Sequence, residues 1–184
     1  IKSVENFDES RTNEIKFLVN SWLIAGILSV TSISTTLGAF GVIVDDKVKK
    51  IDKDFRCSPI SRSSIAGGYI LNSFLIGVIM SVIAFAAGEV FIVASGGELL
   101  PFESILKVLG MILLTVLSAS SMMFFVVSFF NSTNAYATAS TIIGTLIGFI
   151  TGMYLPVGSM PEGVAAVVKL FPISHAASIF RKIF

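Results

Sequence analysis

The chain has few of the residues that form disulfide frameworks, metal centres or most catalytic sites. Its 184 residues include one cysteine, Cys57, and one histidine, His175. A single cysteine excludes an intrachain disulfide. A lone histidine with no carboxylate or cysteine in register does not make a metal or general-base site, because such sites need converging partners. No segment matches the phosphate-binding pattern GxxxxGK[ST], so ATP hydrolysis by this chain is excluded.

Charge is scarce and unevenly distributed. Asp, Glu, Lys and Arg make up 14% of the residues and hydrophobic residues 54%, whereas soluble domains usually carry about 25% charged residues. Three stretches, 17–44, 63–88 and 108–161, have no charge at all. About 20 apolar residues cross a bilayer core, so these stretches accommodate four transmembrane helices. Their continuity excludes a transmembrane barrel, which needs alternating segments of about ten residues.

We therefore predict an all-α polytopic membrane protein that forms one transmembrane domain over residues 1–184. The loop at 45–62 holds six Lys and Arg residues, which favours the cytosolic side. A charged leader then lies outside, and breakers from Pro156 onward are followed by short outer interfacial or re-entrant helices. The predicted segments are the leader 1–16, the membrane spans 17–44, 65–94, 105–130 and 135–155, the cytosolic loop 45–62 and the outer helices 156–184.

The cytosolic loop contains an amphipathic pattern. Val48, Ile51 and Phe55 fall on one helical face, and charged residues occupy the rest of the turn. Pro59 ends the pattern, because a residue before proline avoids the helical region. Such a helix either lies on anionic headgroups or inserts its apolar face into a groove of a cytosolic partner.

Two groups of small or hydroxyl residues occur within the predicted spans. Small residues at four-residue spacing allow close helix approach, either within the chain or at a dimer interface. Hydroxyls either bond back to their own helix or line a polar pathway. The first group is Ser140, Gly144, Gly148 and Gly152, and the second is represented by Ser29, Ser32 and Thr36. Glu89 ends the second uncharged stretch and is expected near the outer interface.

Two segments resemble one family. The segment 54–62, DFRCSPISR, leads into the GYIL of residues 68–71 and resembles the coupling-helix region of type-2 exporter permeases of the ATP-binding-cassette (ABC) family. The segments GMYLP (152–156) and LFPISH (170–175) are similar to that family's outer segment between its last two membrane helices. The resemblance covers essentially the whole chain in order and spacing.

The resemblance implies a six-helix half-transporter from which this chain, beginning at Ile1, lacks the first and last helices. It implies a homo- or heterodimer with a second permease subunit around a substrate pathway, in the plasma membrane of a bacterial cell. Energy would come from a separate ABC ATPase that holds ATP and Mg²⁺, so the chain itself is not an enzyme and binds no cofactor, metal or nucleic acid. The residues expected to dock the ATPase are Val48, Ile51, Phe55, Arg56 and Pro59.

Two other functions remain open at this point. A secondary transporter usually places charged residues or broken helices near mid-membrane, which the uncharged spans argue against. A membrane signalling or assembly protein would also have spans and a docking helix. The transported substrate cannot be read from the sequence, and drugs, peptides, lipids and glycans all fit.

Overall fold

The computed structural model describes residues 2–51, 59–95, 99–154, 163, 168 and 172–183. Side chains are described from Val19 onward and, in the last helix, from Ser174. Within these residues the fold is all helical, as predicted. The helices are α1 (Lys2–Val48), α3 (Arg62–Ala94), α4 (Phe102–Ser128), α5 (Thr133–Ile150) and α7 (Pro172–Ile183).

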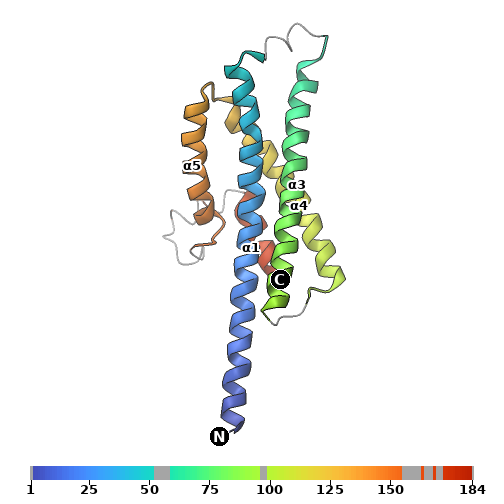
Figure 1. The fold of residues 1–184 in the computed structure, drawn as a ribbon, viewed down its shortest axis with the longest axis vertical. Coiled ribbons are helices and arrows are strands. Elements are labelled where there is room, and N and C mark those ends of the chain that lie inside the picture. The colour runs from blue at the N-terminus through green and yellow to red at the C-terminus, as the bar shows by residue number, and fades with distance from the viewer. Residues whose placement is uncertain are drawn as a thin grey trace.

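Helix α1 is the central element of the bundle. It contacts α3, α4, α5 and α7, and its N-terminal part extends beyond the other helices (Figure 1). The predicted leader is therefore helical and continuous with the first span in its backbone. In the same view α5 lies on one side of α1 and α3 on the other, so α1 separates them.

Helix α3 has the reverse burial pattern of a helix in a soluble protein: small and polar residues lie on its buried face, and large apolar residues are exposed. Its buried face carries Ser73, Gly77 and Ser81, whereas Ile79 and Ile83 are each 57% exposed. In water this arrangement would expose apolar surface and bury polar groups, which is unfavourable. In lipid it is favourable, because small residues admit neighbouring helices and large apolar residues face the acyl chains. The burial pattern therefore supports a membrane environment.

Apolar side chains between the helices form two clusters. One surrounds Phe40 and Val44 of α1 together with Met123 and Val127 of α4, toward the end of α1 at Val48. The other surrounds Leu28 of α1 and includes residues of α3, α4 and α7. The bundle is therefore packed along most of the length that the helices share.

In the part of the chain that the structure describes, three helices are long and apolar enough to cross a membrane, namely α1 from Val19, α3 and α4. These correspond to the first three predicted spans, and the chain is a multi-pass membrane protein. The 18 residues of α5 cover about 27 Å at 1.5 Å per residue, slightly less than a bilayer core of about 30 Å. Helix α5 is not among the three, so the fourth span stays a prediction.

Helix α5 ends earlier than predicted. The sequence placed the end of the span at Leu155, before Pro156, but the last helical residue is Ile150. Gly152 has a left-handed φ of 67°, its N–H donates to the carbonyl of Phe149, and the Met153 N–H donates to that of Gly148. These bonds form a Schellman motif with glycine at its left-handed position. Gly152 therefore terminates α5 before the proline is reached.

Helix α7 packs against α1 and α4. Its apolar face places Ala176, Ala177 and Phe180 in the interior of the bundle. The sequence predicted a short outer interfacial or re-entrant helix here, and the helix observed packs against the bundle. The preceding part of the predicted outer segment, residues 156–171, lies mostly outside the described residues.

Candidate functional site

The predicted docking residues lie around the end of α1. Val48 is the last residue of α1, and Lys50, two residues later, has a left-handed φ of 62°. This conformation interrupts the helix between Val48 and Ile51, so the predicted helical face is not continuous through Val48. Ile51 is half-buried and Pro59 exposed. Phe55 and Arg56 lie outside the described residues, so the docking role stays a prediction.

The last turn of α1 is bonded to the three helices around it. Asp45 Oδ1 accepts a hydrogen bond from the Thr133 hydroxyl at 3.2 Å, and an Asp46 carboxylate oxygen accepts one from the Tyr69 hydroxyl. The ammonium group of Lys47 donates to the carbonyl oxygens of Ser128 at 2.9 Å and Phe130 at 3.3 Å. Sequence reasoning treated these three charges as part of a loop, because it ended the span at Val44.

The hydroxyl residues of α1 lie inside the bundle. Ser29, Ser32 and Thr36 are fully buried, and each donates to a carbonyl oxygen four residues earlier. The Ser32 and Ser81 hydroxyls also lie 2.9 Å apart, which joins α1 to α3. This placement fits the alternative of an ordinary packed membrane helix, and a role in lining a pathway stays a prediction.

The predicted row of small residues on α5 divides into three environments. Ser140 is half-buried, and a Cβ added at Gly144 would meet nothing within 4 Å. A Cβ at Gly148 would collide with the ring of Tyr154, and Gly152 belongs to the helix end. Within the described residues the row therefore does not form one groove filled by a neighbouring helix. Only the part around Gly144 is open.

Glu89 is enclosed by protein. Its side chain is 8% exposed, and Oε2 accepts a hydrogen bond from the Leu100 N–H at 3.3 Å. The neighbouring Gly88 packs against Ile24 of α1, close in sequence to Trp22. The expected position of Glu89 near the outer interface is compatible with this contact, and the side chain is buried there. The carboxylate holds the end of the segment between α3 and α4, just before α4 begins.

Arg181 of α7 ties three elements together at the other end of the bundle. One terminal nitrogen donates to the carbonyl oxygens of Thr151 and Gly152, each at 2.9 Å. The guanidinium carbon lies 3.7 Å from the centre of the Trp22 ring, a cation–π geometry. Desolvation lowers the pKa of Arg181 from its usual value. Sequence reasoning missed this site, because only the fold brings Arg181 to residues about 30 positions earlier.

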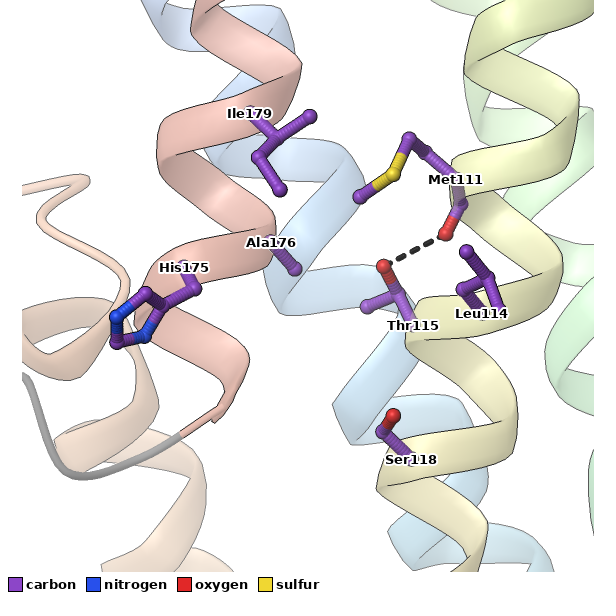
Figure 2. Close-up of a pocket in the computed structure, with 7 residues that line it drawn as sticks. All are labelled: Met111, Leu114, Thr115, Ser118, His175, Ala176 and Ile179. Carbon is purple, nitrogen blue, oxygen red and sulfur yellow. Dashed lines mark hydrogen bonds between the residues drawn. The ribbon is translucent and has the colours of Figure 1, made fainter.

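A small apolar pocket lies between α4 and α7. It has a volume of about 130 Å³, and its lining includes Met111, Thr115, Ala176 and Ile179. Figure 2 shows the Thr115 hydroxyl bonded to the Met111 carbonyl, while the His175 ring points away from α4. Across the described side chains, no group of three His, Cys, Asp or Glu residues converges. The pocket is therefore a small, mainly apolar space between the two helices.

The sequence matches the family described as "ABC-2 family transporter protein" over residues 1–184. No curated protein and no solved structure matches the chain. The match covers every residue, including the parts of the chain that the structure does not describe. The chain therefore belongs to the ABC-2 family of transporter proteins.

Proposed function

We propose that this chain is the membrane permease of an ATP-driven exporter, coupled to a separate ABC ATPase. The observation that carries the proposal is the family match over the whole chain. Three membrane-spanning helices and the reverse burial pattern of α3 support the membrane part of the proposal. The basic loop after α1 supports a cytosolic contact with the ATPase.

The proposed docking surface is the apolar face that includes Ile51 and Phe55. In helix-in-groove recognition a few apolar anchors supply most of the binding energy. Phe55→Asp should therefore abolish capture of the ATPase by the full-length chain while membrane insertion is kept. Phe102→Asp is a matched control, because Phe102 is 81% exposed at the start of α4, on the opposite side of the membrane in the proposed orientation.

The test uses tagged full-length protein purified together with a candidate ABC ATPase. Bound ATPase is quantified, and its ATP hydrolysis in proteoliposomes is compared with that of the ATPase alone. Loss of binding with Phe55→Asp but not with Phe102→Asp is the expected result. Undiminished binding with Phe55→Asp would exclude the docking surface, and failure of the wild-type chain to bind an ATPase would exclude the exporter.

We also propose that a second permease subunit covers the open face of α5. Helix α5 packs chiefly against α1, and it leaves Ile142 55% and Leu146 51% exposed beside the open position Gly144. Gly144→Leu would push a neighbouring backbone away and should reduce the dimer fraction in detergent. Gly110→Leu on α4 is the control, since an added Cβ there also meets nothing within 4 Å. Equal dimer fractions would assign the α5 face to lipid.

A further inference from the structure

Three consecutive residues at the end of α1, which we call the clasp, each bond a different helix. Asp45 bonds Thr133, the first residue of α5, and Asp46 bonds Tyr69 of α3. Lys47 bonds the carbonyl oxygens of Ser128 and Phe130 at the end of α4. Successive residues of an α-helix point about 100° apart, so three neighbours in sequence reach three surrounding helices.

The charges of the clasp suit the helix ends that they touch. The last carbonyls of a helix lack partners within the helix and carry partial negative charge. Lys47 places its ammonium group on such carbonyls at the end of α4. The first turn of a helix carries partial positive charge, and Asp45 places its carboxylate at the first residue of α5. The contacts of Lys47 and Asp45 are therefore electrostatically favourable as well as hydrogen bonded.

The position of the clasp gives it a mechanical role. It occupies the last turn of α1, immediately before the left-handed Lys50 and the loop that carries the proposed docking surface. Tyr136 of α5, whose hydroxyl bonds the Leu37 carbonyl, adds a second link to α1 on the same side. A displacement of the loop that reaches α1 therefore passes through a turn that is already tied to three helices.

We infer that the clasp distributes movement of the docking loop to α3, α4 and α5, with one side chain serving each helix. This inference rests on the proposed function, since it assumes an ATPase that moves the loop. Lys47 and Asp46 are positioning residues that act through the helices they hold. Removal of one contact should then affect the helix that it serves and leave the movement of the others intact.

The experiment follows the movement of α3 and that of α4 separately, in the complex of the full-length chain with its ATPase. An environment-sensitive bimane label is placed at Val90→Cys in α3 or at Phe102→Cys in α4, positions that are 69% and 81% exposed. Both are made with Cys57→Ser, because Cys57 is the chain's only native thiol. The measured quantity is the change in label emission when ATP and vanadate are added.

Lys47→Met keeps the apolar stem of the side chain and removes its ammonium group. It should abolish the ATP-dependent change at the α4 label and preserve the change at the α3 label. Tyr69→Phe removes a single hydroxyl. It should reduce the ATP-dependent change at the α3 label, because α3 also follows the loop directly in the chain, and it should preserve the change at the α4 label. Lys47→Arg should retain the response at both labels, and so should Lys49→Met, which changes an exposed neighbouring lysine.

A contact that only stabilises the fold would not produce this helix-specific pattern. Unchanged responses in both Lys47→Met and Tyr69→Phe would overturn the inference, and so would equal loss at both labels in each variant. If Lys47→Met does not assemble, Tyr69→Phe alone decides between these outcomes. A wild-type complex that binds the ATPase but shows no response at either label refutes the clasp and leaves docking intact, whereas absence of ATPase binding refutes the proposed function.

Discussion

A methyl group at Gly77 should separate three helices of the bundle. A Cβ added at this position would lie 2.6 Å from Val116 Cγ1 of α4 and 2.9 Å from Thr36 Oγ1 of α1. Cβ atoms in proteins essentially never come so close to other heavy atoms. Val116 and Thr36 are fully buried and β-branched, so neither side chain can rotate away cheaply. The helices themselves must move apart in Gly77→Ala.

The expected magnitude follows from two opposing effects. Replacement of glycine by alanine within a helix stabilises it by up to about 1 kcal/mol, whereas overpacking of a filled interior costs about 1–3 kcal/mol. Gly110→Ala on α4 is the control, because its added Cβ meets nothing within 4 Å and only the favourable effect applies. The two variants should differ by about 1–3 kcal/mol, which corresponds to roughly 2–12 °C in midpoint temperature for a domain of this size.

The assay is thermal unfolding of the full-length protein in detergent, followed by the loss of the monodisperse peak in size-exclusion chromatography. Gly77→Ala should have the lower midpoint and Gly110→Ala a midpoint equal to or above that of the wild type. Equal midpoints for the two variants would show that α1 and α4 leave room beside Gly77, and the described packing of α3 would then be wrong.

Further predictions concern the other end of the bundle, helix α5 and the topology. Arg181→Met removes the cation that lies over Trp22, the chain's single tryptophan, and should increase quenching of its fluorescence by acrylamide, whereas the neighbouring Lys182→Met should not. Tyr136→Phe should destabilise the protein by about 0.5–1.5 kcal/mol, since it removes the hydrogen bond to the Leu37 carbonyl. An equal loss of stability in Tyr154→Phe, at an exposed tyrosine, would show that this hydrogen bond is not the cause. An impermeant thiol reagent should leave Cys57 unlabelled in intact cells, because positively charged loops stay inside. Labelling of the wild type that disappears in Cys57→Ser would show that the loop faces outward and that the proposed orientation is wrong.

The membrane class and the long helices could be predicted from the sequence, because length without charge is sufficient evidence for a crossing. The ends of the helices were harder to predict. Asp45, Asp46 and Lys47 were assigned to a loop, yet they form the last turn of α1. Their charges do not oppose helix formation, since each reaches a polar partner on another helix. Charge in a sequence marks proximity to water or to a partner, and it does not by itself end a helix.

The small-residue row on α5 shows a second limit. A spacing of four residues describes one face of a helix, but the same glycine is also the preferred residue at a left-handed helix end. Gly152 fitted the row in sequence and terminates the helix in the structure. The two roles differ in backbone conformation and backbone hydrogen bonding, which residue type does not reveal. Contacts across long sequence separations, such as Arg181 with Thr151, were likewise beyond sequence reasoning.

The unequal lengths of the helices have a consequence for the surrounding lipid. Helix α3 has 33 residues and α5 has 18, which correspond to about 50 Å and about 27 Å along their axes. A bilayer with a core of about 30 Å cannot match both at once. If α5 crosses the membrane as predicted, the acyl chains beside it must compress slightly, and beside α3 the membrane must thicken or the helix must incline. A protein of this shape should therefore impose an uneven membrane thickness around itself and respond to the chain length of the lipids in which it is reconstituted.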